Sequence, residues 1–337
     1  MKPNLSEFIG NTPLVELELP FAQERFRIFA KLEMFNPGGS IKDRPALHMV
    51  KEAMKSGRIN ENTHLIESSS GNLAIAMAMI ARQMKLKFTA VIDPNITTTN
   101  RELIESYGAS IDLVDEKDEE GGYLHTRIRR VETLLAEVPN SVWLNQYANP
   151  DNPAAHYHGA GAEIVNGMPV EPTHAFICVS TCGTIMGLAR RLKEAWPRIR
   201  IVAVDIAGSV IFGPSRDRRR IPGIGASRVP EQLDRSLIDE VVLVNDFESV
   251  EACRLLVQEE GLLAGGSSGS VIAAIRKLGP QLPKNAVIVT VLPDRGERYL
   301  DSVYNPDWLP EPERVHRPLA SSHVVVVQDA IQFQNAS

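Results

Sequence analysis

The chain has 337 residues, of which 43% are apolar and 23% are charged, and its formal net charge is −6. These values are ordinary for a globular protein of about two domains, and the acidic balance without a basic tail argues against a nucleic-acid binder. No run approaches the ~20 consecutive apolar positions of a membrane helix, and the first residues lack the apolar core of a signal peptide. We therefore expect a cytoplasmic protein with no membrane or nucleic-acid partner.

The cysteine and histidine patterns predict no metal site. The cysteines are odd in number and show no Cys-x-x-Cys spacing: Cys178, Cys182 and Cys253. Neither a disulfide framework nor a zinc site follows from them, so we expect reduced thiols. His156 and His158 flank Tyr157 without an acidic or cysteine cluster beside them, and we interpret both as helix-surface or packing residues.

From about residue 60 the sequence alternates short β-branched apolar runs with longer segments of helical period, the signature of βαβ units and a parallel sheet. The first block has predicted strands at 64–67, 88–93, 110–114 and 141–146, and predicted helices at 72–84, 99–107 and 123–138. After a helix at 155–165, the second has strands at 174–179, 200–205, 241–244 and 286–291, and helices at 184–196, 247–260 and 268–278. We predict an α/β fold of two three-layer domains, with ligands at the carboxyl ends of the strands.

Two segments interrupt this alternation. Residues 209–237 contain several arginines and prolines without a clear period, which favours a long functional loop or an inter-subunit element. Residues 305–337 contain more prolines and then the apolar run 324–327, which predicts either a swapped edge strand or a tail.

Lys42 follows a glycine pair, Gly38 and Gly39, just after the apolar strand-like run 27–33. A backbone that turns through two glycines lets an amine approach a bound carbonyl closely, and surroundings that disfavour the ammonium form make a lysine nucleophilic. Lys42 is therefore a candidate for Schiff-base chemistry. The alternative, a solvated lysine in a loop before a helix, would be preferred for this pattern taken alone.

Residues 68–72, Ser-Ser-Ser-Gly-Asn, follow a predicted strand and open a predicted helix. Hydroxyls, an amide side chain and unpaired backbone N–H groups converge there at the positive end of a helix, which favours binding of a carboxylate. A serine N-cap with spare hydroxyls is the alternative for this stretch alone.

Residues 180–184, Ser-Thr-Cys-Gly-Thr, occupy a second joint between a predicted strand and a predicted helix. Backbone donors and helix polarity make such a turn a phosphate cradle. The stretch lacks the lysine of a Walker loop, so a nucleoside triphosphate is disfavoured.

Residues 265–270, Gly-Gly-Ser-Ser-Gly-Ser, run into a helix predicted from about residue 268. The glycines permit close approach to a flat ligand, and one serine hydroxyl could face a ring nitrogen. A capped helix start is the alternative.

Taken in order, these stretches resemble the fold type II pyridoxal 5′-phosphate enzymes of the cysteine synthase and cystathionine β-synthase family. Further stretches carry the resemblance from about residue 5 to 304: IGNTPLV at 9–15, NQY at 145–147, GIGA at 223–226 and GERYL at 296–300. It implies a tryptophan synthase β-like fold with the cofactor in a cleft between two αβα domains, and a homodimer. The smaller domain would comprise residues 36–147 and the larger one residues 1–35 and 148–304, followed by a C-terminal extension at 305–337.

By this resemblance, Lys42 would be the catalytic residue and would hold pyridoxal 5′-phosphate as an internal aldimine. Asn72 would contact the 3′-oxygen of the cofactor, and Ser267 would face its pyridine nitrogen. The cofactor phosphate would be bound by the loop Ser180, Thr181, Cys182, Gly183 and Thr184, and the substrate carboxylate by Ser69, Ser70 and Gly71. The implied reaction is a β-replacement, in which Lys42 removes the α-proton, the β-leaving group departs and a nucleophile adds to an α-aminoacrylate.

The sequence departs from cysteine synthases where the substrates would lie. SSGNL at residues 69–73 replaces TSGNT, STCGT at 180–184 replaces GTGGT, and Tyr147 replaces a phenylalanine. Together with PDRG at 293–296, these substitutions are similar to the siderophore-pathway branch. Its members join O-phospho-L-serine to L-glutamate and make N-(2-amino-2-carboxyethyl)-L-glutamate, a precursor of 2,3-diaminopropionate.

A dianionic leaving group and a dicarboxylate nucleophile both need cationic partners. We expect Arg127, on a helix that could face the cleft, to bind substrate together with Tyr147, and Arg218 and Arg228 are further candidates. The alternatives within the family are cysteine synthesis from O-acetylserine or O-phosphoserine with sulfide, and a cysteate-type synthesis with sulfite.

Two other classes of function fit the sequence less well. A non-catalytic binding protein that merely retains the fold would not need the residue type at every cofactor-contacting position. An NAD-dependent dehydrogenase would need a glycine fingerprint on a strand-helix turn, and the sequence has none.

Overall fold

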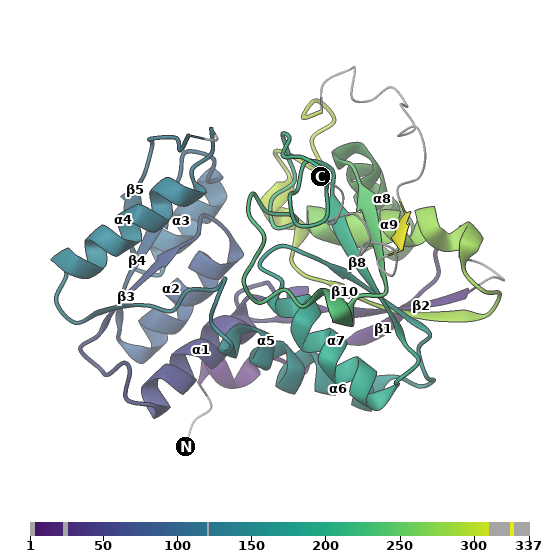
Figure 1. The fold of residues 1–337 in the computed structure, drawn as a ribbon, viewed down its shortest axis with the longest axis horizontal. Helices are drawn as coiled ribbons and strands as arrows, with labels where there is room; N and C mark the ends of the chain where they lie inside the picture. The colour runs from purple at the N-terminus through teal and green to yellow at the C-terminus, as the bar shows by residue number, and fades with distance from the viewer. Residues whose placement is uncertain (1–3, 23–25, 120, 310–323, 327–337) are drawn as a thin grey trace, which may run out of the picture.

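Two sheets organise the computed structural model, which describes residues 4–22, 26–119, 121–309 and 324–326. Figure 1 shows them in two lobes that lie beside each other. The small lobe, residues 43–143, contains the four-stranded sheet, and the large lobe contains the seven-stranded sheet and the helices packed on it. Where the two lobes meet, the helix that opens the small lobe packs against the first helix of the large lobe.

The sheet of the small lobe is entirely parallel, in the order β5-β4-β3-β6. Its elements are α1 (Asp43–Lys55), β3 (His64–Ser68), α2 (Asn72–Met84), β4 (Lys87–Ile92), α3 (Thr98–Ser106), β5 (Ser110–Leu113), α4 (Leu124–Glu137) and β6 (Ser141–Trp143). Helices α1, α2 and α3 contribute to the core on one face, and α4 packs on the other. Because α2 is apolar on nearly all sides, it is buried along most of its length.

The sheet of the large lobe has the order β1-β2-β10-β7-β8-β9-β11, with antiparallel strands at both edges. Its strands are β1 (Leu14–Leu17), β2 (Phe26–Leu32), β7 (His174–Cys178), β8 (Arg200–Ile206), β9 (Glu240–Val244), β10 (Ala286–Leu292) and β11 (Val324–Val326). Helices α6 (Ala162–Gly167) and α7 (Gly183–Ala195) cover one face, and α8 (Asp246–Glu260) and α9 (Gly266–Leu278) cover the other. Central parallel strands buried on both faces explain the continuous apolar runs in the sequence.

The carboxyl ends of β3, β6, β7 and β10 lead into loops that meet where the lobes join. Asn72 of the small lobe donates to Asp294 of the large lobe over 2.7 Å. Asn152 donates to the Gln146 carbonyl over 2.6 Å and to the Thr181 hydroxyl over 3.5 Å. The motifs that are far apart in the sequence therefore converge on one region, as parallel α/β sheets require.

The predicted α/β fold class is confirmed, and each strand and helix predicted between residues 64 and 291 is present. Strand β6 ends at Trp143 instead of residue 146, because Asn145 turns the chain with a φ of 56°. The helix predicted at 155–165 starts earlier, as α5 (Asp151–His156), and continues through the π-helical turn η3 (Tyr157–Gly161) into α6.

Residues Val324–Val326 of the apolar run near the C-terminus form the edge strand β11, antiparallel to β9, so this part is not simply a tail. Residues 310–323 and 327–337 of the predicted extension lie outside the described residues, and a swapped strand stays a prediction. The domain boundaries at residues 35/36 and 147/148 remain predictions.

Candidate active site

Lys42 immediately precedes α1, and its half-buried side chain lies among groups of both lobes. Burial lowers the pKa of its amine, and the nearby charges of Asp294 and Cys182 oppose that shift. In the described part of the chain, no hydrogen bond or ion pair occupies the Lys42 Nζ. The structure therefore presents an amine whose surroundings favour its neutral, nucleophilic form.

The loop before Lys42 has a shape that requires its glycines. Gly38 N–H donates to Asp43 Oδ2 over 2.5 Å, and a Cβ on Gly38 would lie 2.4 Å from the other oxygen of that carboxylate. Gly39 adopts a φ of 79°, which L side chains rarely adopt. Ile41 N–H donates to the Pro293 carbonyl over 2.8 Å, and this bond ties the loop to the end of β10.

Asn72 is held in place by a network that the sequence analysis did not identify. Its Nδ2 donates to Asp294 Oδ2 over 2.7 Å, and its Oδ1 accepts from Arg298. The Tyr299 hydroxyl also donates to Asp294. Burial raises the pKa of Asp294, and the hydrogen bonds from Tyr299 and Asn72 oppose that rise. Asp294, three residues after the end of the predicted strand 286–291, was the available signal for this network.

The serine loop after β3 leaves the amino-terminal end of α2 without a side-chain cap. The N-cap residue is Gly71, so the alternative of a serine N-cap is wrong. Ser69 is buried, and its hydroxyl accepts from Gly71 N–H over 3.3 Å. The uncapped first-turn N–H groups of α2 are donors available to an anion.

Arg127 reaches this loop from α4. Its Nη1 donates to the Ser70 hydroxyl over 3.0 Å and lies 3.0 Å from Asp93 Oδ2. The Ser70 hydroxyl also donates to Asp93 over 3.1 Å. Arg127 Nε is buried with no hydrogen-bond partner. The structure thus brings together Ser70 and Arg127, which the sequence separates by more than fifty residues.

The loop after β7 forms the amino-terminal end of α7, which also has no side-chain cap. Cys182, the N-cap residue, has a φ of 64°, and Ser180 donates to the Gly225 carbonyl over 3.2 Å. A Cβ on Gly183 would lie 2.1 Å from Asn152 Oδ1, so only glycine fits there. Backbone N–H groups at a helix start, free of a competing side chain, match the predicted phosphate cradle.

His156 is fully buried and lies beside this cradle, with its Nε2 3.3 Å from the Thr184 hydroxyl. It is therefore a packing histidine and not a surface one. Ser267 is buried in the first turn of α9, which starts at Gly266, two positions before the predicted start.

Tyr147 is surrounded by arginines. The Arg228 guanidinium lies over its ring, 4.8 Å from the centroid. Burial raises the pKa of Tyr147, and the charges of Arg127, Arg228 and Arg219 oppose that rise. The Arg218 side chain, by contrast, is exposed, so the structure does not place this candidate in the group at Tyr147. Arg219 was not among the predicted site residues, and only its place in the basic run 216–220 pointed to it.

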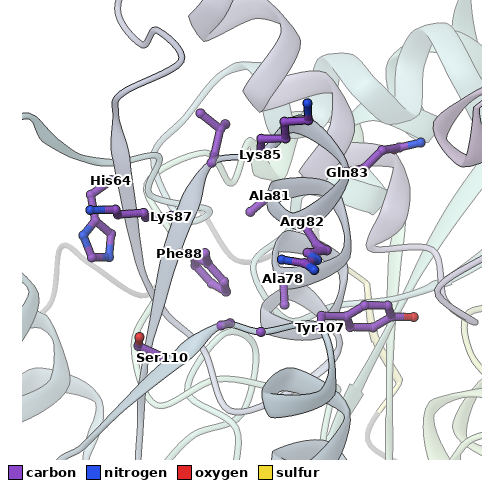
Figure 2. A pocket seen from close by; sticks show the side chains of 13 residues that line it. His64, Ala78, Ala81, Arg82, Gln83, Lys85, Lys87, Phe88, Tyr107 and Ser110 are labelled. Carbon is purple, nitrogen blue, oxygen red and sulfur yellow. The ribbon is translucent and has the colours of Figure 1, made fainter.

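A separate hollow of about 590 Å³ lies at the opposite end of the small sheet (Figure 2). It is lined by residues at the starts of the strands, including His64 and Lys87, and by the end of α2, including Arg82 and Lys85. Cations at the carboxyl end of a helix stabilise its dipole, which accounts for Arg82 and Lys85 without a ligand.

In the described part of the chain, no three or more His, Cys, Asp or Glu side chains are grouped so that they could hold a metal ion. No helix among the described residues combines the length and apolarity needed to cross a bilayer.

Comparison with known proteins identifies the family. Residues 5–294 match the family of pyridoxal-phosphate dependent enzymes. The chain belongs to this family. A lysine amine without a partner, an uncapped helix start for a phosphate and a buried serine for a ring nitrogen together fit this cofactor.

Solved structures are similar over nearly the whole chain. An O-acetylserine-dependent cystathionine β-synthase from Helicobacter pylori is 33% identical, with a TM-score of 0.83 over 90% of this chain and 99% of that one. An O-ureido-L-serine synthase is 31% identical, with a TM-score of 0.84 over 92% and 97%. A hydrogen sulfide-producing enzyme from Fusobacterium nucleatum is 31% identical, with a TM-score of 0.84 over 89% and 100%. The chain is thus a pyridoxal-phosphate-dependent enzyme of the cysteine synthase group, whose members carry out β-replacement.

Proposed function

We propose that the protein joins O-phospho-L-serine to L-glutamate by pyridoxal-phosphate-dependent β-replacement, giving N-(2-amino-2-carboxyethyl)-L-glutamate and phosphate. This product is the 2,3-diaminopropionate precursor of siderophore pathways. The observation that supports the proposal most directly is the Arg127 guanidinium at the Ser70 hydroxyl, beside the uncapped start of α2. A permanent cation in the predicted substrate loop suits a leaving group with two negative charges, whereas an acetyl leaving group makes no such demand.

The cofactor, when bound, supplies the electron sink that makes the α-proton of the amino acid acidic. In the proposal, Lys42 holds the cofactor aldehyde and, once displaced by the substrate amine, takes the α-proton on its Nζ. The lack of another partner for this Nζ and its lowered pKa support both roles. Asn72 faces the cofactor 3′-oxygen, and its amide is kept in one orientation by Asp294 and Arg298.

In the proposal, the remaining contacts to the cofactor and to the substrate carboxylate come from residues at the starts of α7, α9 and α2. The N–H groups at the start of α7, in the loop Ser180, Thr181, Cys182, Gly183 and Thr184, bind the cofactor phosphate in the proposal. Ser267, in the first turn of α9, offers a neutral hydroxyl to the ring nitrogen. Ser69, Ser70 and Gly71 bind the substrate carboxylate at the start of α2.

In the proposal, Arg127 stabilises the departing phosphate. Its Nη1 is already engaged by Ser70 and Asp93, which fixes the guanidinium beside the serine loop. Tyr147 adds a hydroxyl where cysteine synthases have a phenylalanine, on a ring that Arg228 holds.

A second candidate is addition of a sulfur nucleophile to an activated serine. The similar enzyme from Helicobacter pylori depends on O-acetylserine, and the one from Fusobacterium nucleatum produces hydrogen sulfide. Sulfite as nucleophile, giving cysteate, belongs to the same class.

The purified protein should be mixed with O-phosphoserine or O-acetylserine, and with glutamate, sulfide or sulfite, and the products identified by mass. We expect the glutamate adduct and one equivalent of phosphate from O-phosphoserine. A sulfur adduct without any glutamate adduct would replace the proposal by the second candidate. Borohydride reduction should fix the cofactor on Lys42, and Lys42→Ala should lose both this label and turnover, by at least about 10³-fold.

We further propose a cytoplasmic homodimer, as the resemblance to cysteine synthases implies. Light scattering of the purified protein should then give a particle of two 37.2 kDa chains. A monomer at micromolar concentration would contradict the dimer.

A further inference from the structure

The charges of three arginines from both lobes act on Tyr147, and one of them, Arg228, lies over its ring. Arg127 comes from α4, whereas Arg219 and Arg228 come from the loop 209–237 of the large lobe. Each has one buried nitrogen without a hydrogen-bond partner: Arg127 Nε, Arg219 Nη1 and Arg228 Nε. A buried donor that is left unpaired costs free energy, so three of them in one region point to a ligand with several acceptor oxygens.

These arginines differ in how their charge is balanced. Arg127 lies 3.0 Å from Asp93, and Arg228 lies 2.7 Å from Glu231. The Arg219 side chain makes a hydrogen bond to the neutral Ser227 hydroxyl, 2.9 Å from its Nη2, and forms no ion pair within the described residues. Burial lowers the pKa of Arg219, which shows how poorly its charge is solvated. Of these three arginines, Arg219 is thus the one without an ion pair among the described residues, although the charges of Asp205 and Asp246 act on it.

The free nitrogen of Arg219 is close to the substituted loops of the cleft. A Cβ on Gly225 would lie 2.8 Å from Arg219 Nη1, and Gly225 adopts a φ of 70°. The same glycine accepts a hydrogen bond from Ser180 and donates one from its N–H to the Val179 carbonyl over 2.7 Å. Gln232 of the same loop donates to the Gln146 carbonyl over 3.2 Å, which holds the loop against the residue before Tyr147.

We infer that Arg219 is a specificity-determining residue that binds the side-chain carboxylate of a dicarboxylate nucleophile, with Arg228 beside it on Tyr147. This inference rests on the proposed function and assigns a residue to the second substrate. In this inference Arg127, at the serine loop, serves the leaving phosphate, and Arg219, which forms no ion pair within the described residues, takes the carboxylate of the nucleophile. A nucleophile without a second carboxylate would form no ion pair with Arg219.

The test compares Arg219→Gln with Arg218→Gln, a change of the same chemistry at the neighbouring exposed side chain. With saturating O-phosphoserine, Arg219→Gln should raise the KM for L-glutamate by about 10- to 100-fold while kcat stays within about twofold, since a buried charge partner of one carboxylate is lost. Arg218→Gln should leave both values unchanged. Arg219→Lys, which keeps the charge, should recover part of the affinity.

Two readouts do not depend on turnover. Calorimetry should show that glutarate, a dicarboxylate without the reacting amine, binds the native protein and Arg218→Gln but binds Arg219→Gln far more weakly. The cofactor absorbance and its change on adding O-phosphoserine should be the same in all variants.

The outcomes separate the two proposals. A native enzyme that makes no glutamate adduct overturns the proposed function, and the inference with it. A native enzyme that makes the adduct, with an unchanged glutamate KM in Arg219→Gln and Arg219→Lys, overturns only the inference. Loss of cofactor absorbance in Arg219→Gln would instead show that Arg219 supports cofactor binding. That result would also overturn the inference.

Discussion

The two regions that we propose to bind anions are built from different chemical groups. The cradle at the start of α7 consists of backbone N–H groups around a cysteine with left-handed backbone, and it has no ionised side chain of its own. The region around Tyr147 consists of arginine side chains from α4 and the loop 209–237. A backbone cradle is pre-organised by the helix and suits a cofactor that stays, whereas guanidinium groups recognise anions by charge and geometry and suit substrates that exchange.

This difference predicts that side-chain changes are costly around Tyr147, where side chains supply the donors. They should be tolerated at the start of α7, where the backbone supplies them. The following experiments test this contrast in order of the expected size of effect.

Removing the Arg127 charge should have the largest effect. We expect Arg127→Gln to lower kcat/KM for O-phosphoserine by about 10³-fold, since a desolvated charge partner of the phosphate is lost. Steady-state kinetics with O-acetylserine on the same protein should show a much smaller loss. Arg130→Gln, one turn further along α4, removes a half-exposed pair with Asp112 and should change neither value. An equal loss with both serine esters would show a merely structural role for Arg127.

Glu67, which lies just before the serine loop, should make the free energy of unfolding depend on pH. It is buried at the end of β3, where it accepts from Trp143 Nε1 over 2.7 Å, and burial raises its pKa to about 7. Because this value exceeds 4.5, its ordinary value, the folded state holds the proton more tightly than the unfolded chain. The free energy of unfolding should therefore fall as pH rises from about 4.5 to 7, by at most about 3 kcal/mol from this group.

Urea unfolding at several pH values checks this, with Glu67→Gln as the variant that should lose the slope and be the more stable form above pH 7. The control is Glu61→Gln, an exposed acid three residues before β3. An unchanged slope in Glu67→Gln would contradict the assignment.

Changing Cys182 should have the smallest effect, although it lies inside the proposed cofactor-phosphate cradle. In Cys182→Gly, relief of left-handed backbone strain opposes the loss of a buried thiol and the extra entropy of an unfolded glycine, so we expect a stability change within about 1 kcal/mol. Cofactor affinity, measured by titration of the apoprotein, should stay the same, because the donors are backbone groups. A large loss of cofactor affinity in this variant would remove the contrast between the two sites.

Much of the fold was predictable because its signals are local. Apolar runs of β-branched residues gave the parallel strands, and the strand-helix joints at residues 68–72 and 180–184 marked two helix starts that the structure leaves uncapped. The errors are local as well. The predicted β6 was too long, because nothing in the run 141–146 announces the positive φ of Asn145, and the predicted helix at 155–165 began too late because Pro153 hid its first turn.

The candidate site also divides into residues that the sequence predicted and contacts that it could not predict. The sequence by itself determined the family-like motifs and the candidate residues Lys42, Asn72 and Ser267, because each stands at a fixed offset from a strand end or a helix start. Only the tertiary structure decided that Asp294 orients Asn72, and that the charges of Arg127 and Arg219, from opposite lobes, both act on Tyr147. Contacts between residues far apart in the chain depend on how two sheets pack, and no local pattern encodes which long side chain is left buried without a counter-ion.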